Sequence, residues 1–188
     1  MSLFKLAVEK YVKLSPASFH ELEDITTLCQ FKQDEFILKH DAICKHIYFV
    51  NKGLIRIYYL KESRDITEWF AYDNQFFFSI ISYFNESPSK LIIQCIEDCD
   101  ILFLPKSNLE QLSSVNIEIS KLYRSLLAHS LIGSQLRMES IQFETALQRY
   151  QGLLKNNPEI IRRAPLKYIA SFLGINVETL SRIRNQIH

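Results

Sequence analysis

Apolar residues follow one pattern at the two ends of the chain and another between them. Residues 3–30 carry apolar positions that favour helices, interrupted at Ser15-Pro16, and these helices are expected to cover one end of the structure that follows. From residue 36 to residue 104, short runs rich in β-branched and aromatic residues predict an antiparallel sandwich or barrel. The predicted strands are 36–38, 47–50, 54–60, 66–70, 91–95 and 101–104.

A hairpin turn is predicted between the second and third of these strands. Asn51-Lys52-Gly53 places a glycine where a positive φ is wanted. The pattern returns to helix from Glu110, and residues 116–141 predict one long helix of roughly 39 Å. Phe143 to Leu154 predicts a further helix, closed by Asn156-Asn157-Pro158.

The long helix has an apolar stripe wider than one contact surface needs. One side is expected to lie on the barrel, and the other to meet the same helix of a second subunit, with Gly133 permitting close approach. The barrel side contains Ile119, Leu122, Leu126, Gly133 and Leu136. The predicted dimer contacts are Tyr123, Leu127, Leu131 and Met138.

The C-terminal stretch 164–186 predicts two short helices joined by a tight turn. Pro165 can open the first helix, because its fixed φ suits a first turn. Gly174 can end that helix in a left-handed conformation, and Asn176 can cap the second. The small residue expected at the helix crossing and the two inward apolar anchors are Ala170, Leu180 and Ile183. This spacing indicates a helix-turn-helix whose second helix could enter a major groove.

Arginines remain on the outer face of the second helix. Arg182 is expected to pair with guanine through its planar fork, and Glu178 to accept from cytosine or orient that arginine. Arg184, Lys167 and Arg163 are expected to meet phosphates. The predicted DNA-binding residues are Lys167, Val177, Glu178, Ser181, Arg182, Arg184 and Asn185. The competing interpretation is a purely structural helical hairpin.

The net charge of +1 hides an asymmetry along the chain. Residues 149–188 carry seven basic and two acidic side chains, whereas the remainder has an acidic excess. A basic end on an acidic body suits nucleic-acid binding, although solvation of helix surfaces would leave the same composition. We predict three parts, 1–115, 116–141 and 142–188, which are coupled because no Gly/Ser linker separates them.

Residues of catalytic and metal chemistry are scattered. The four cysteines form no CxxC pair, so buried free thiols are expected, and the five histidines contain no H-x-H pair. A cupin-type metalloenzyme is therefore disfavoured, and no nucleophile elbow or phosphate loop suggests another enzyme. No apolar run approaches a bilayer span and no signal-peptide core is present, so we expect a cytoplasmic protein without a membrane partner.

The order of helix, barrel, long helix and basic helix-turn-helix resembles the Crp/Fnr family of bacterial transcription regulators. The supporting stretches are 48–58, similar to the family's barrel hairpin, 97–106, similar to its final strands, and 170–184, its helix-turn-helix. The resemblance implies an α+β fold with a jelly-roll sensor barrel, a dimerisation helix and an all-α DNA-binding domain. It also implies a homodimer that reads a palindromic DNA operator, with RNA polymerase as a further partner.

Two departures from the family pattern bear on function. Members that bind cyclic AMP hold its phosphate with a Gly-Glu-Leu turn followed by an Arg-Ser pair, whereas residues 74–90 contain neither glycine nor arginine. Cyclic AMP is therefore not expected to bind, and the effector is unknown. We expect no counterpart of the family's β-wing, because the sequence ends at His188, directly after the second predicted helix.

The aromatic residues of this region favour core packing, with a pocket for a different ligand as the alternative. Lys90 could meet an anion as a point charge only. The tentative ligand residues are Trp69, Phe76, Phe78 and Lys90. We predict a regulator rather than an enzyme. The alternative is a ligand-binding module whose C-terminal helices transmit signals or dimerise without binding DNA.

Overall fold

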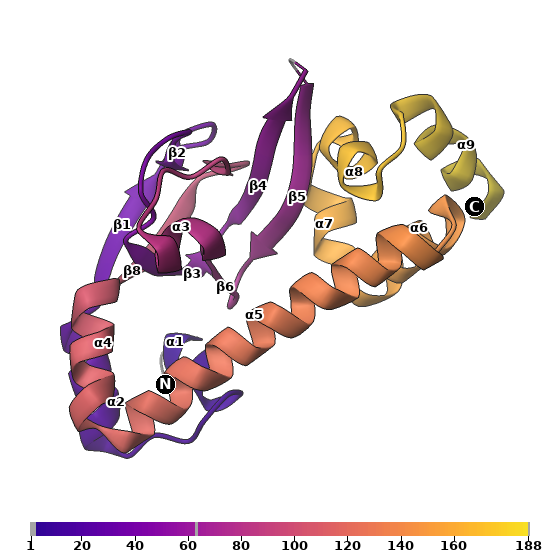
Figure 1. Ribbon diagram of the computed structural model, residues 1–188. Coiled ribbons are helices and arrows are strands. Elements are labelled where there is room, and N and C mark those ends of the chain that lie inside the picture. The colour runs from indigo at the N-terminus through magenta and orange to yellow at the C-terminus, as the bar shows by residue number, and fades with distance from the viewer. Residues whose placement is uncertain (1–2, 63, 188) are drawn as a thin grey trace.

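The computed structural model describes residues 3–62 and 64–187 and has a β-barrel at one end and a group of helices at the other (Figure 1). The described strands form two antiparallel sheets, in the orders β1-β8-β3-β6 and β2-β7-β4-β5. The bounds are β1 Thr27–Phe31, β2 Phe36–Leu38, β3 His46–Lys52, β4 Leu54–Lys61, β5 Arg64–Tyr72, β6 Phe76–Phe77, β7 Ile92–Cys95 and β8 Cys99–Pro105. The predicted antiparallel barrel is thus confirmed.

Two strands were not predicted. The expected helical region up to residue 30 ends earlier, because Leu28 lies in β1 and pairs with Leu102 of β8. The second strand is β6, where Phe76 and Phe77 pair with β3. The predicted hairpin turn is present, and Gly53 has a φ of +117°. A Cβ at this position would lie 2.4 Å from the Cys99 sulfur, so both conformation and space require glycine.

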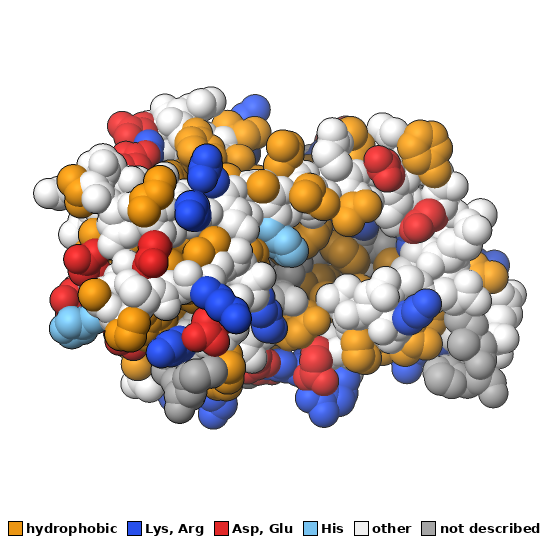
Figure 2. All heavy atoms as spheres, turned by 90° about the horizontal axis from the view of Figure 1, so that it is seen from below, with side chains coloured by type: hydrophobic (Ala, Val, Ile, Leu, Met, Phe, Trp, Pro, Cys, Tyr) orange, Lys and Arg blue, Asp and Glu red, His pale blue; other side chains and the backbone are white. Residues whose placement is uncertain are grey.

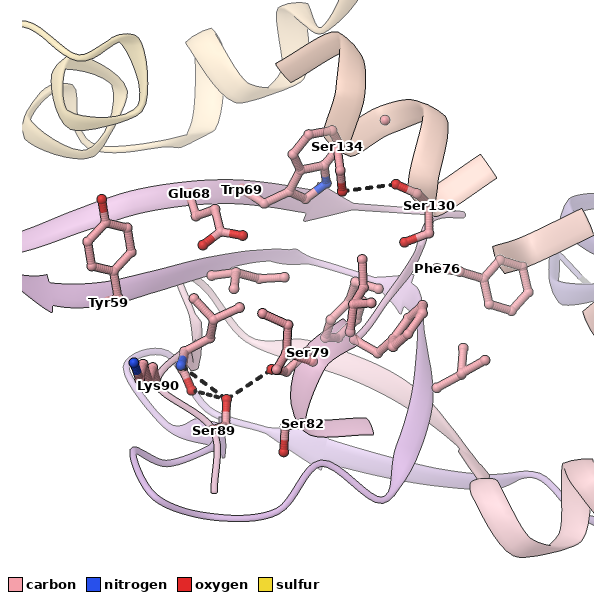
Figure 3. Close-up of a pocket in the computed structure, with 18 of the residues that line it drawn as sticks. Tyr59, Glu68, Trp69, Phe76, Ser79, Ser82, Ser89, Lys90, Ser130 and Ser134 are labelled. Atoms are coloured by element: carbon pink, nitrogen blue, oxygen red, sulfur yellow. Dashed lines mark hydrogen bonds between the residues drawn. The ribbon is translucent and has the colours of Figure 1, made fainter. Parts of the chain in front are cut away.

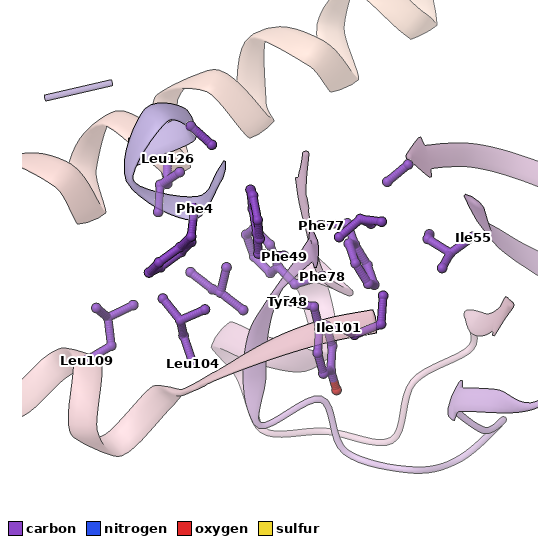
Figure 4. Packing of buried hydrophobic residues seen from close by; sticks show 14 of the residues in the cluster. Phe4, Tyr48, Phe49, Ile55, Phe77, Phe78, Ile101, Leu104, Leu109 and Leu126 are labelled. Carbon is purple, nitrogen blue, oxygen red and sulfur yellow. The ribbon is translucent and has the colours of Figure 1, made fainter. Parts of the chain in front are cut away.

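Four short helices surround the barrel: α1 Leu3–Glu9, α2 Pro16–Asp24, α3 Ile80–Asn85 and α4 Lys106–Val115. The break predicted at Ser15-Pro16 begins α2, since the Ser15 hydroxyl accepts from the Ser18 N–H at 3.3 Å. Phe4 of α1 packs against Phe49 of β3, with ring centroids 5.2 Å apart. The main core therefore lies between the sheets and these helices (Figure 4).

The long helix α5 spans Ile117–Phe143 and runs from the barrel to the C-terminal helices (Figure 1). Asn116 separates it from α4 and caps it, because its side-chain oxygen accepts from the Glu118 and Ile119 N–H groups. Ile119, Leu122 and Leu126 are buried as predicted. Leu136 is 60% exposed, so its predicted place on the barrel was wrong. No described helix is long and apolar enough to cross a membrane.

The C-terminal part contains α6 Ala146–Asn156, α7 Pro158–Arg163, α8 Leu166–Leu173 and α9 Val177–Ile187. Its hydrophobic core is shared with the barrel, because Leu54, Phe70 and Ile96 join the cluster of buried residues from α6 to α9. Helix α8 lies beside β5 (Figure 1). The two parts are packed together and share one apolar cluster.

Candidate DNA-binding surface and ligand cavity

Helices α8 and α9 form a helix-turn-helix with the predicted local geometry. Gly174 has a φ of +68° and ends α8 in the left-handed conformation. Asn176 caps α9, since its side-chain oxygen accepts from the Thr179 N–H at 2.7 Å. The three apolar anchors Ala170, Leu180 and Ile183 are buried. Their burial fixes the rotation of α9, and therefore the face that it presents outward.

The outward face of α9 contains most of the predicted DNA-binding residues. Val177, Glu178, Arg182, Arg184 and Asn185 are exposed, and Ser181 is half-exposed. Neither Arg182 nor Arg184 forms a hydrogen bond or ion pair with another residue in the described part of the chain. Lys167, on α8, is also exposed, and its ammonium lies 4.8 Å from the Tyr168 ring centroid. The arginine side chains of this face are free to meet an external anion.

Arg163 does not belong to this face. Its side chain is only 15% exposed and forms ion pairs with Asp73 at the end of β5 and Glu97 in the β7–β8 turn. Asp73 also accepts from the Gly53 N–H at 3.1 Å, so the network reaches the β3–β4 hairpin. The prediction that Arg163 meets phosphate was wrong, because its charge is already paired within the chain.

A second arginine, Arg56 on β4, also connects the barrel with the C-terminal helices. It is 2% exposed, donates to Asp65 at 2.6 Å, and lies between two tyrosine rings. Its guanidinium carbon is 3.9 Å from the Tyr58 ring centroid and 3.5 Å from that of Tyr168 on α8. Sequence reasoning assigned it no role, although an arginine within the apolar run Leu54-Ile55-Arg56-Ile57 was a signal of a buried, paired charge.

Ser171 and Phe172 complete the contact between α8 and the barrel. The Thr67 N–H donates to the Ser171 hydroxyl at 2.9 Å, and that hydroxyl donates to the Asp65 carbonyl at 3.2 Å. Phe172 packs edge-on against Phe70 of β5, with centroids 5.5 Å apart. The inner side of the helix-turn-helix is therefore bound to the β4–β5 hairpin, while α9 faces away from it (Figure 1).

A cavity of about 1250 Å³ lies between the barrel, α5 and the C-terminal helices. Hydrophobic side chains gather around a hollow in the middle of one face of the molecule (Figure 2). The cavity is lined by all four tentative ligand residues, Trp69, Phe76, Phe78 and Lys90. Phe78 is almost fully buried and packs on Tyr83, so it also serves the core.

Serine hydroxyls on the cavity wall bond to one another and to backbone groups. Ser79 and Ser89 lie 2.9 Å apart, and Ser89 also donates to the Leu91 carbonyl and accepts from the Leu91 N–H (Figure 3). Ser82 donates to the Ser87 carbonyl and accepts from the Cys44 N–H. This segment is the one that departs from the cyclic AMP motif, and its hydroxyls are used to hold its own fold.

The predicted dimer contacts divide between two environments. Tyr123 is partly buried and its hydroxyl donates to that of Tyr83 on α3, and Leu127 is partly buried and lines the cavity. Leu131 and Met138 are exposed, at 64% and 48%. Gly133 lies under Trp69, where an added Cβ would be 3.4 Å from the indole ring. The close approach that Gly133 permits is thus to the barrel of its own chain.

The four cysteines are free thiols, and Cys44, Cys95 and Cys99 are buried as predicted, whereas Cys29 is only half-buried. Among the described residues, no group of histidine, cysteine, aspartate or glutamate side chains is arranged to hold a metal ion. His129 packs edge-on against Tyr11, with centroids 5.3 Å apart. The chemistry of the chain is therefore concentrated in the cavity and on the outer face of α9.

We compared the chain with known protein families, curated proteins and solved structures. Residues 28–116 match the family model of the cyclic nucleotide-binding domain, and a search of curated proteins found no match. FixK2 from Bradyrhizobium japonicum is similar in structure, with a TM-score of 0.72, 24% identity, and coverage of 87% of this chain and 85% of its own.

Two further solved structures are similar over most of both chains. The c-di-GMP responsive global regulator CLP from Xanthomonas campestris has a TM-score of 0.70 and 12% identity, and covers 92% of this chain and 91% of its own. A protein from Eubacterium rectale, named as a transcriptional regulator of the Crp/Fnr family, has a TM-score of 0.68 and 19% identity, with coverage of 90% and 82%. Residues 28–116 are therefore similar to cyclic nucleotide-binding domains, and the chain shares its fold with these solved structures.

Proposed function

We propose that the protein is a DNA-binding transcription regulator of Crp/Fnr type that acts as a homodimer on a palindromic operator. The observation that carries the proposal is the outer face of α9, whose arginines have no hydrogen-bond or ion-pair partner among the described residues while buried anchors hold the helix in place. The N-terminal turns of the second helix are the part that meets base edges in helix-turn-helix docking. The similar proteins named as regulators support the same role.

DNA binding is tested by fluorescence anisotropy with the intergenic DNA beside the protein's own gene and with random DNA of equal length. The Arg182→Ala variant should weaken the specific site by about 1–3 kcal/mol per half-site and change binding to random DNA much less. Lys167→Ala should weaken both and flatten the salt dependence by about one charge per subunit. Equal losses of Arg182→Ala on both DNAs would refute base reading, and a chain that binds neither DNA would favour the ligand-binding module.

The homodimer is proposed from the far half of α5. Leu131, Ile132, Leu136 and Phe143 are 57–79% exposed there, and a row of large apolar side chains on one helix is typical of an interaction surface. Sedimentation at tens of micromolar should give a dimer, and Ile132→Glu with Leu136→Glu should give monomers. A wild-type monomer under these conditions would refute the dimer. Leu127 is less suitable for this test, because it also lines the cavity.

We further propose that the regulator does not respond to cyclic AMP. The only lysine or arginine on the cavity wall is Lys90, counted among described residues, and it offers no bidentate fork to a phosphate. The serine hydroxyls beside it are already hydrogen-bonded. Calorimetric titration should detect no binding of cyclic AMP, and a micromolar or tighter dissociation constant would contradict the proposal.

A further inference from the structure

An irregularity in β5 directs a carboxylate into the cavity. Along the β4–β5 ladder Ile57 pairs with Trp69 but Tyr58 pairs with Thr67, so Glu68 is an extra residue without a partner on β4. Such a β-bulge breaks the alternation of side chains between the two faces of a sheet, and bulges are frequent beside binding sites, where they re-aim a side chain. Glu68, the residue at this bulge, lines the cavity together with the two residues that follow it, Trp69 and Phe70 (Figure 3).

The Glu68 carboxylate has no hydrogen bond or ion pair with any residue in the described ranges. It is accessible from the cavity, yet the surrounding protein removes enough water to raise its pKa, and the nearby Arg137 only opposes that shift. Arg137 is itself engaged, because it donates to the Phe172 carbonyl and its guanidinium lies 3.9 Å from the Phe172 ring centroid. Glu68 is exposed to the open cavity, and its carboxylate accepts no hydrogen bond from a protein donor in the described part of the chain, so it can accept one from a ligand.

Aromatic side chains contribute to the wall of the cavity that Glu68 lines. Tyr59, Trp69, Phe76 and Phe172 come from the barrel and from α8, and in Figure 3 Trp69 lies between Tyr59 and Phe76, which are at opposite ends of the view. Aromatic rings on several sides favour a flat apolar ligand through stacking and edge contacts. The neighbouring positive charge of Arg137 disfavours a cationic ligand, and among the described lining residues no arginine offers an anionic ligand a bidentate fork.

We propose that this cavity binds an uncharged aromatic small molecule that stacks near Trp69 and donates an O–H or N–H hydrogen bond to Glu68. Its biological meaning rests on the proposed regulator, since the ligand would be the effector of that regulator. Binding of the ligand in the cavity does not require DNA, so it is measured on the protein alone.

The chain supplies its own reporter for this test, because Trp69 is its single tryptophan. N-phenyl-1-naphthylamine is a neutral aromatic probe with one N–H group, and its fluorescence rises in apolar surroundings. Bound in the cavity, it should accept excitation energy from Trp69 and quench the tryptophan emission with saturation. Ser134→Phe should reduce that binding at least about tenfold, because Ser134 lines the cavity and its hydroxyl bonds only within α5.

The hydrogen bond is tested with two competitors of nearly equal shape, 2-naphthol and naphthalene, of which only the first has a donor. For the wild-type protein, 2-naphthol should displace the probe about tenfold more effectively than naphthalene. In Glu68→Leu this ratio should fall to about one. In the matched control Glu139→Leu, on the exposed surface of α5, the ratio should stay unchanged.

Each outcome decides the proposal. Absence of saturable quenching by the probe, or an unchanged ratio in Glu68→Leu, overturns it. A misfolded variant would also lose the probe, so circular dichroism of each variant checks that it is folded. The ratio of displacement by 2-naphthol and by naphthalene in the wild-type protein tests the hydrogen bond without any substitution. Anisotropy with DNA, measured both without and with the saturating aromatic probe, reports on the regulator separately, so a chain that binds the probe but no DNA in either condition refutes the proposed function alone.

Discussion

Arg163 and Arg182 belong to the same basic segment, but the fold gives them opposite surroundings. Arg163, at the end of α7, is mostly buried and paired with Asp73 and Glu97 of the barrel. Arg182, on α9, is exposed and unpaired among the described residues. A net positive charge counted along a sequence therefore overstates the charge available to DNA, because part of it neutralises carboxylates at an internal contact. We expect the arginines at the contact between the barrel and the C-terminal helices, Arg56 and Arg163, to govern stability. We expect Arg182, on the outer face of α9, to govern DNA binding.

The largest effect on stability is expected at Arg56, the most buried arginine at the contact between the barrel and the C-terminal helices, which we call the inner contact. Arg56→Ala removes the guanidinium between Tyr58 and Tyr168 together with its ion pair to Asp65, and leaves a cavity. We expect a loss of about 3 kcal/mol in the free energy of unfolding. Urea denaturation measures it, with Arg64→Ala as a control at an exposed position at the start of β5, which should change stability by less than about 0.5 kcal/mol. A loss at Arg56 no larger than that of the control would contradict its role.

Arg163→Ala should have the next largest effect, a loss of about 1–2 kcal/mol. The cost is smaller than at Arg56 because Asp73 and Glu97 are partly exposed and can be hydrated once their partner is gone. The neighbouring Arg162 is the matched control, since its side chain is 72% exposed and pairs only with Glu159 of its own helix. Arg162→Ala should be nearly neutral in the same denaturation. Similar losses for both variants would mean that the ion pairs across the contact are not what stabilises it.

Six of the described strands and the helix-turn-helix were predictable because they depend on local pattern, whereas β1 and β6 were missed. Gly53, Gly174 and Asn176 have the conformations that their residue types favour, and the buried positions of α9 follow from helical spacing. The inner contact was not predictable in the same way. Arg163 carries the same local signal as Arg182, and only the partners brought close by the tertiary fold distinguish them. The cavity was predictable only in part. Its aromatic residues were predicted from the sequence, but the position of Glu68 depends on the register between β4 and β5, which no single segment determines.

A smaller effect should appear as a dependence of stability on pH. Burial alone would raise the pKa of Asp73, but hydrogen bonds from Arg163 and from the Gly53 N–H lower it below its ordinary value. A carboxylate with a depressed folded-state pKa contributes stability above its unfolded pKa, and this is lost as pH falls through the folded value. The wild type should therefore lose more stability than Asp73→Asn when the pH is lowered from about 5 to about 3. Parallel acid unfolding curves for the two proteins would show that Asp73 is not stabilised by this network.

The smallest effect on stability is expected at Arg182, and it separates the two sides of the domain most directly. Because its side chain contacts no described partner, Arg182→Ala should change the free energy of unfolding by less than about 0.5 kcal/mol. The same protein should lose specific DNA affinity, whereas Arg163→Ala should lose stability and keep its preference for specific over random DNA. Denaturation and anisotropy on the same two preparations test this crossed pattern. If Arg182→Ala were as unstable as Arg163→Ala, its DNA defect would follow from unfolding, and the division between an inner structural set and an outer binding set of arginines would be wrong.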